Sequence, residues 1–222
     1  GGVNVSDNSS ALISNSSIQD NSSSRGGGLY ISSTGLSGYG LHLINSEVSS
    51  NYASDTGGGI ELSGSYSVID NCNISDNIGE NTGGIASMWG ANPLIMNSLF
   101  FNNTNNSSNA GGALHFWESN GILEHNTIVG NHSSYGAITA GNGGSPVINN
   151  SIIANNYSPV IWVQNSGSPI FSYCTIFNNT NFNSTYQGEG CMFEDPLFCD
   201  YENNDFSLNE NSPSLEIGRA HV

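Results

Sequence analysis

The side chains in this sequence best suited to catalysis are two glutamates, Glu61 and Glu118. Paired carboxylates hydrolyse glycosidic bonds when one acts as general acid and the other as base or nucleophile, about 5 to 10 Å apart. Glu61 directly follows its Gly-Gly-Ile anchor, whereas Glu118 lies four residues beyond Leu114 of the equivalent anchor. We therefore expect the two carboxylates to lie out of register, and they are weak catalytic candidates.

The charge balance argues against partners that are polyanions. Lys and Arg together number 2 against 18 Asp and Glu, which gives a net charge of −16 at pH 7. Such an acidic surface repels nucleic acids and anionic polysaccharides, and the sequence offers no cationic clamp for a uronate. We predict no nucleic-acid partner and favour a role that is not enzymatic.

Aromatic residues after several Gly-Gly motifs predict a sugar-binding face. Alternation along these segments places one column outward: Tyr30, Glu61, Ala86, His115, Thr139 and Trp162. The next positions along the same face hold Met88, Trp117, Gln164, Trp89 and Glu118. Flat aromatic rings stack on sugar rings, and polar groups beside them bond hydroxyls. The candidate contacts for a neutral polysaccharide or cell-surface glycan are Tyr30, Trp89, His115, Trp117, Trp162 and Gln164. Alternatively, these aromatic side chains pack under a loop or against a neighbouring domain.

Two motifs recur along the chain and indicate the elements that position these residues. One is typified by Asn71-Cys-Asn-Ile74-Ser-Asp-Asn77, and its copies begin at residues 15, 45, 71, 97, 125, 150 and 173. Subtracting successive starts gives spacings of 23 to 30 residues. The other motif, typified by Gly58-Gly-Ile60, recurs in phase with the first. Periods of this length indicate a solenoid in which each repeat packs on its neighbours.

Each repeat has the pattern of β structure. Leu29-Tyr-Ile31 and Ile60-Glu-Leu62 alternate with the period of a half-buried strand. A coil of three short strands cannot bury a face alone, so the coils must stack in parallel about 4.8 Å apart. The prediction is an all-β parallel β-helix of about seven coils with three short strands in each. In this arrangement Ile74 stacks between Val48 and Phe100.

A structural column of asparagines is predicted at one corner of the coils. Ile69 points inward and Asp70 outward, so Cys72 and Ile74 can point inward again only after a sharp bend at Asn71. Such a bend favours a left-handed backbone, which Asn tolerates best after Gly. Stacking aligns Asn15, Asn45, Asn71, Asn97 and Asn150, with interruptions at positions 125 and 173. Their amides are expected to hydrogen-bond from coil to coil.

Gly111-Gly-Ala-Leu114 and Phe100-Phe-Asn-Asn103 resemble the repeats of polymorphic outer-membrane proteins and related right-handed parallel β-helix surface proteins. The resemblance implies a right-handed β-helix over residues 1–188 and an extracellular or cell-surface location. It also implies a stalk, adhesin or glycan-contacting module of a larger protein. The alternative is a glycoside hydrolase or lyase of the pectin-lyase-like fold. Asp195-Pro-Leu-Phe198 resembles the ending of secreted bacterial and archaeal β-helix proteins, which implies that residues 189–216 are a truncated segment that closes the last coil.

The cysteines and aspartates carry further expectations. Cys72 and Cys174 occupy the inward position after the bend, four coils apart, and are expected to be small buried hydrophobic residues. Cys191 and Cys199 form a disulfide or remain two free thiols, and both alternatives stay open. The sequence contains no zinc motif and predicts no cofactor. Calcium would find oxygen ligands, without a definable site, at Asp55, Asp70, Asp76 and Asp195.

The two ends of the sequence depart from the repeat pattern. The chain opens inside a repeat at Gly1-Gly-Val3, so we expect its true N-terminus and further domains to lie outside this sequence. Residues 217–222 fit no motif, and one set of codons for them, ATC GGA AGA GCA CAC GTC, reads as a sequencing adapter. We expect these residues to be an artefact of an assembled environmental read. No apolar run approaches the roughly 18 residues that cross a membrane, so no insertion is predicted.

Overall fold

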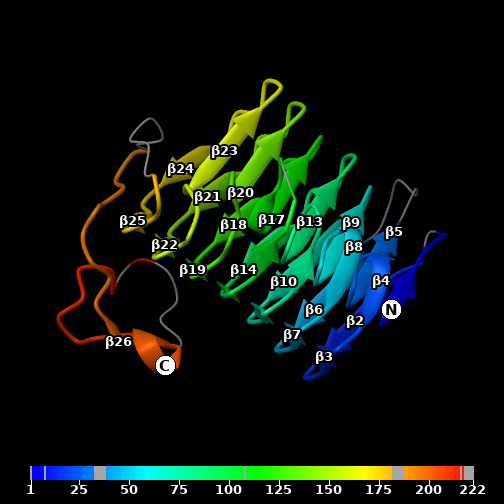
Figure 1. Cartoon of the computed structure of the whole chain (residues 1–222), viewed down its shortest axis with the longest axis horizontal. Coiled ribbons are helices and arrows are strands. Elements are labelled where there is room, and N and C mark those ends of the chain that lie inside the picture. Colours follow the sequence, from blue (N-terminus) through cyan, green and yellow to red (C-terminus); the bar gives the residue numbers. More distant parts are fainter. Residues whose placement is uncertain are drawn as a thin grey trace.

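The computed structural model describes residues 2–7, 9–32, 39–107, 109–181, 188–215 and 217. The chain coils into a rod, and Figure 1 shows strands of successive coils stacked from the N-terminal end in blue to the last coil in yellow. Three sheets of seven parallel strands run along the rod, which confirms the prediction of about seven coils with three short strands each. A fourth sheet, with four strands, lies between the third and the first.

The sheets are numbered in the order in which each coil passes through them. Sheet 1 contains β1 (Val3–Val5), β5 (Leu29–Ser32), β9 (Ile60–Ser63), β13 (Ile85–Met88), β17 (Gly111–Trp117), β20 (Gly136–Gly141) and β23 (Ile161–Gln164). Sheet 2 contains β2 (Ala11–Ser14), β6 (Tyr39–Ile44), β10 (Tyr66–Asp70), β14 (Leu94–Met96), β18 (Ile122–Glu124), β21 (Val147–Asn149) and β24 (Ile170–Ser172). Sheet 3 contains β3 (Ser17–Gln19), β7 (Glu47–Ser49), β11 (Asn73–Ser75), β15 (Leu99–Phe101), β19 (Thr127–Val129), β22 (Ile152–Ala154) and β25 (Thr175–Phe177). Sheet 4 contains β4 (Ser22–Arg25), β8 (Tyr52–Thr56), β12 (Ile78–Gly79) and β16 (Thr104–Asn105).

The interior of the rod is a continuous stack of apolar side chains, one layer per coil. Ile74 pairs with Val48 on one side and with Phe100 on the other, as predicted, and all three are buried. Full burial of such a side chain contributes about 1.5 to 3 kcal/mol relative to exposure. Because a single coil is too thin to bury its own apolar residues, this stabilisation exists only between stacked coils.

The Gly-Gly motifs fit a corner between sheet 4 and sheet 1 that has no room for a side chain. A Cβ atom on Gly58 would lie 2.5 Å from the carbonyl oxygens of both Ile78 and Gly83. A Cβ atom on Gly59 would lie 3.0 Å from Nδ2 of Asn77. The glycines therefore allow adjacent coils to approach closely at the point where each sheet 1 strand begins.

The predicted asparagine column has the expected backbone. A left-handed conformation, with φ between 45° and 53°, occurs at Asn15, Asn45, Asn71, Asn97 and Asn150. The expected bonds between amides are replaced in part by bonds to carboxylates. Nδ2 of Asn71 donates to Oδ1 of Asn45 at 2.8 Å, but Nδ2 of Asn97 donates to the carboxylate of Asp70 at 2.8 Å. The reason is that this corner faces solvent, where acidic side chains of the preceding coil are within reach.

A second, buried asparagine ladder runs through the rod at the last position of each repeat. It begins at half-buried Asn21, and its buried members are Asn51, Asn77, Asn103, Asn131, Asn156 and Asn179. Oδ1 of Asn103 accepts from the backbone N–H of Asn77 at 3.2 Å and from its Nδ2 at 3.0 Å. Nδ2 of Asn103 donates to the carbonyl of Ile74 at 2.8 Å and to Oδ1 of Asn131 at 3.0 Å. Each buried amide is therefore fully satisfied, as burial requires.

The C-terminal segment, residues 188–215 and 217, leaves the coils and folds back beside sheet 3. Figure 1 shows it in orange to red, with β26 labelled. The segment contains the antiparallel strands β26 (Phe198–Asp200) and β27 (Asp205–Leu208), joined by the 3-10 turn η2 (Tyr201–Asn203). Phe198 and Leu208 pack against a buried cluster that includes Ile152 and Ala154 of sheet 3. Of the six terminal residues, the structure describes Ile217 alone, and it is buried in the same cluster.

Cys191 and Cys199 do not form the disulfide that the sequence left open. Both are free thiols in the structure, with Cys199 exposed on β26. Cys191 instead packs against the core at the end of the coils, where its thiol is in hydrogen-bond contact with Cys174. Cys72 and Cys174 are buried, as predicted.

Candidate functional site

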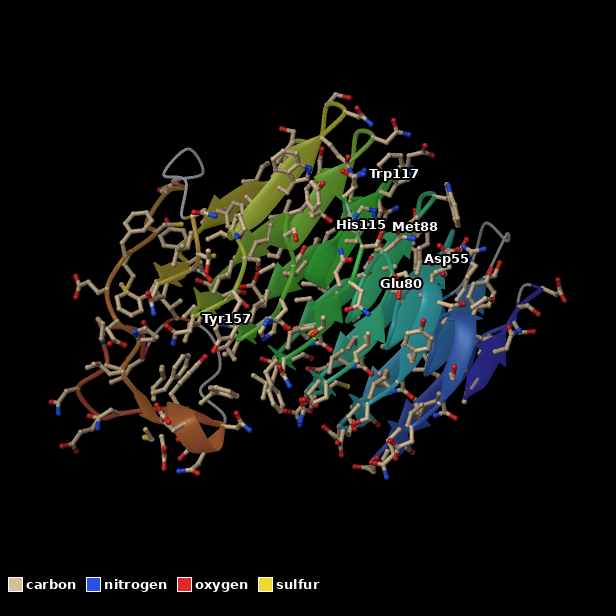
Figure 2. All side chains as sticks on the ribbon, in the orientation of Figure 1. Asp55, Glu80, Met88, His115, Trp117 and Tyr157 are labelled. Atoms are coloured by element: carbon tan, nitrogen blue, oxygen red, sulfur yellow. The ribbon has the colours of Figure 1, made fainter. Side chains whose placement is uncertain are left out.

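The outer face of sheet 1 carries the residues that the sequence assigns to glycan binding. Strand pairing aligns, in one column, Tyr30, Glu61, Ala86, His115, Thr139 and Trp162. A second column lies two residues further along the strands. In it Met88 pairs with Trp117, Trp117 with Gly141, and Gly141 with Gln164. Figure 2 shows Met88, His115 and Trp117 close together on this part of the rod. The predicted alignment is therefore correct, although its members differ in exposure.

The centre of this column is closed to solvent, which corrects the expectation that His115 contacts a ligand. The residue is only 5% exposed, and its Nδ1 shares a hydrogen bond with the hydroxyl of Thr139. Burial lowers the pKa of His115 to about 4, so its imidazole is neutral at pH 7. Its ring stacks with Trp117, with centroids 6.0 Å apart. His115 therefore supports the ring of Trp117 and does not reach a ligand itself.

A loop from a neighbouring coil also reaches over this face. Asn105 closes the loop that precedes β17. Its Nδ2 donates to the carbonyl of Ala110, and its Oδ1 accepts from the N–H of Ser107. Further along, the carbonyl of Asn109 accepts a hydrogen bond of 3.0 Å from Nε2 of Gln164 on β23. Gln164 is thus fixed by the protein, so at least one of its polar hydrogens is unavailable to a sugar. This contact involves a glutamine and no aromatic ring, so the expectation that the aromatic side chains pack under a loop stays a prediction.

Arg25, the single strong base within the repeats, neutralises the buried carboxylate of Glu61. Nε of Arg25 donates to Glu61 at 3.0 Å, Nη2 makes a second bond, and the hydroxyl of Thr56 makes a third. The side chain of Glu61 is 0% exposed. Burial raises the pKa of Glu61, while the bonds from Arg25 and Thr56 oppose this shift. The guanidinium also lies 5.2 Å from the ring centre of Tyr30 and 4.9 Å from that of Trp89, within cation–π range.

The tryptophan and tyrosine rings of this face remain accessible at the two ends of the column and beside it. Trp89 is 47% exposed and Trp162 is 41% exposed, while Trp117 and Tyr30 are half-buried. Trp162 is braced by an edge-on contact with Tyr135, with ring centres 5.4 Å apart. Trp117 lies against Gly141, where a Cβ atom would come within 2.7 Å of the indole ring. We call Tyr30, Trp89, Trp117 and Trp162 the aromatic row.

A sequence profile of the right-handed β-helix region matches residues 1–108 and 99–218. The chain belongs to the right-handed β-helix family. No curated protein sequence matches this β-helix. Among solved structures, QnrB1, a plasmid-mediated fluoroquinolone resistance protein, aligns at 10% identity over 84% of this β-helix and 91% of that chain, with a TM-score of 0.19. A likeness that weak carries no argument about function, and the family itself hosts many functions.

The two carboxylates considered for catalysis are not brought together in this β-helix. Glu61 is held by Arg25 and Thr56, whereas exposed Glu118 accepts a hydrogen bond from Nδ2 of Asn142 in the next coil. They are separated by two coil spacings, about 10 Å, and by three residues along the strand, about 10 Å more. A carboxylate pair for glycoside hydrolysis therefore does not form from these residues.

Three of the four aspartates named as oxygen donors for calcium bond to asparagines of neighbouring coils, whereas Asp195 accepts from the backbone N–H of Leu197. Asp55 accepts from Asn81 at 2.8 Å, and Asp76 accepts from Asn102 at 2.5 Å. Within the described residues, no three His, Cys, Asp or Glu side chains lie close enough to hold one ion. The same part of the chain contains no helix long and apolar enough to cross a membrane.

Proposed function

We propose that this β-helix is a secreted or cell-surface module, acting as a stalk or adhesin part of a larger protein, that holds a neutral glycan along the outer face of sheet 1. The observation that carries the proposal is the aromatic row. Its four rings come from four different coils, and each leaves part of its surface open to solvent. A chain of sugar rings lying along the rod would meet them in succession.

The chemistry of this face favours sugars without charge. Apolar sugar faces stack on aromatic rings, and this contact loses little conformational entropy because the rings are already held by Arg25, His115 and Tyr135. With 18 acidic side chains against 2 basic ones, an anionic polymer would meet net repulsion. Asn142 and Glu118, which lie at the rim beyond Trp117, supply polar groups for hydroxyls.

Intrinsic tryptophan fluorescence tests this proposal directly. The chain has 3 tryptophans, and all of them belong to the aromatic row, so emission reports on this face alone. Titration with neutral oligosaccharides should shift the emission, while a polyuronate of similar length should not. Trp117→Ala and Trp162→Ala should each weaken binding at least about tenfold, which corresponds to about 1.4 kcal/mol.

The matched control is Tyr157→Ala, which removes an aromatic side chain that is 58% exposed outside sheet 1. This variant should bind sugar as the wild type does. If both tryptophan variants bind like the wild type, or if no neutral glycan changes the emission, the aromatic row is purely structural. Release of new reducing ends during the titration would favour the alternative, a polysaccharide hydrolase or lyase.

A further inference from the structure

Two cysteines from different parts of the chain meet at the C-terminal end of the core. Met192 forms a parallel bridge with Thr175 of β25, and its backbone N–H donates to the carbonyl of Cys174 at 2.9 Å. This register sets Cys191, the residue before Met192, beside Cys174. Both side chains pack in the same apolar cluster, and their thiols are in hydrogen-bond contact. The pairing therefore has a fixed geometry and is not an accident of two mobile side chains.

We propose that Cys174 and Cys191 form a disulfide that locks the C-terminal segment onto the last coil, and that they do so by reacting with a disulfide oxidant such as oxidised glutathione. Residues opposite each other on parallel strands have Cα atoms about 5 Å apart, inside the range of about 4.4 to 6.8 Å that a disulfide spans. Both side chains already point into one cluster, so the bond needs no rearrangement of the backbone.

The exposure of the two thiols sets the order of the reaction. Cys191 is half-buried and open to an oxidant, whereas Cys174 is 0% exposed. The Cys191 thiol loses its proton and attacks one sulfur of the oxidant, whose S–S bond breaks and whose other half leaves as a thiol carrying that proton. Cys174 then loses its proton and attacks the sulfur of Cys191, which expels the second thiol with the second proton. Two protein thiols are thereby oxidised by two electrons, and one oxidant disulfide is reduced to two thiols.

The hydrogen bond between the two thiols assists the first step. It lowers the pKa of Cys191 and raises the pKa of Cys174, which is also buried. Cys191 is therefore the thiol that ionises first, and the thiolate is the attacking species. Cys199 is exposed on β26 and is not a member of this cluster, so it is not part of the proposed bond.

The crosslink would protect the open end of the solenoid. The last coil presents unpaired backbone groups that are a template for association with another chain. Residues 189 and 192 cover part of that edge through their bridges to Ser172 and Thr175. A covalent bond at this point keeps the cover in place and holds Met192, Phe198 and Ile217 over sheet 3.

Peptide mapping of the full chain tests the proposal. The folded, reduced protein is incubated with oxidised glutathione in about tenfold excess over reduced glutathione, quenched with acid, alkylated and cleaved after glutamate. Cleavage at Glu189 and Glu194 puts Cys174, Cys191 and Cys199 on three separate peptides, so each pairing has its own mass. We expect the Cys174 and Cys191 peptides to be linked and to separate on reduction. The oxidised protein should unfold about 5 °C above the reduced protein.

Two variants separate the proposed bond from its alternatives. Cys199→Ser should retain both the linked peptides and the rise in Tm. Cys191→Ser should lose both while keeping the circular dichroism spectrum of the reduced wild type. A Cys191–Cys199 peptide in the wild type, or alkylation of all cysteines after the same oxidation, would overturn the proposal.

Discussion

The carboxylate of Glu61 is fully buried, and its charge is balanced by the guanidinium of Arg25, which reaches it from the preceding coil. The side chain of Arg25 is itself 31% exposed and is bracketed by the rings of Tyr30 and Trp89. This ion pair joins two coils and fixes one end of the aromatic row. It therefore links the stability of the rod to the shape of the candidate site.

Removal of Arg25 should destabilise the fold, because it leaves a buried carboxylate without a partner. We expect Arg25→Ala to reduce the free energy of unfolding by about 3 kcal/mol, measured by urea unfolding. The double variant Arg25→Ala with Glu61→Gln should recover a large part of this loss, because the orphaned charge is gone. If the free energy of unfolding of Arg25→Ala lies within about 0.5 kcal/mol of the wild-type value, the pair behaves as an ordinary surface ion pair.

The two asparagine columns should respond differently to substitution. Asn103→Ala removes four hydrogen bonds from a buried ladder and leaves their partners unsatisfied, so we expect a loss of at least about 3 kcal/mol. Asn71→Ala loses the bond to Asn45 and places Ala at a φ of 53°, for about 1 to 2 kcal/mol. Asn71→Gly, which accepts that backbone, should lose less than Asn71→Ala. Equal losses at positions 71 and 103 would contradict the burial of the ladder.

His115 should make the fold weaker in acid. Its pKa is about 4 in the folded chain and about 6.5 when unfolded, so the unfolded chain binds the extra proton between these values. Its contribution is fully present above about pH 6.5 and is lost as the pH falls towards 4, by about 3 kcal/mol in total. We expect the urea midpoint of the wild type to fall more steeply from pH 7 to pH 4.5 than that of His115→Gln. Parallel pH profiles for the two proteins would show that burial does not keep His115 neutral.

The fold was predictable because stacking repeats one requirement in every coil. The layer formed by Val48, Ile74 and Phe100 is visible in the sequence since each coil must supply an apolar residue at the same point. The buried ladder was less obvious, because both columns contain asparagine. One signal does distinguish them. The exposed column admits His125 and Tyr173, which tolerate a left-handed backbone, whereas the buried column is asparagine throughout its length because only that amide satisfies both neighbours.

The site was only partly predictable, because its covering groups do not follow the repeat. Alternation correctly placed His115 on the outer side of its strand, but its surroundings there include Thr139 and Trp117, which do not recur at the equivalent positions of the other coils. The proximity of Cys191 to Cys174 was likewise hidden, since the C-terminal segment has no register in common with the coils. Periodic contacts leave a mark in a sequence, whereas contacts made once do not.

The ladder of buried asparagines also has a mechanical meaning. Its bonds from one asparagine to the next and those of the sheets run from coil to coil along the rod, so tension applied between the two ends loads the junctions in series. Each junction resists with the bonds of a single coil, and the end coils peel first. A released coil of 26 residues lengthens the molecule by about 80 Å, so a solenoid of this design yields stepwise and absorbs work at every step.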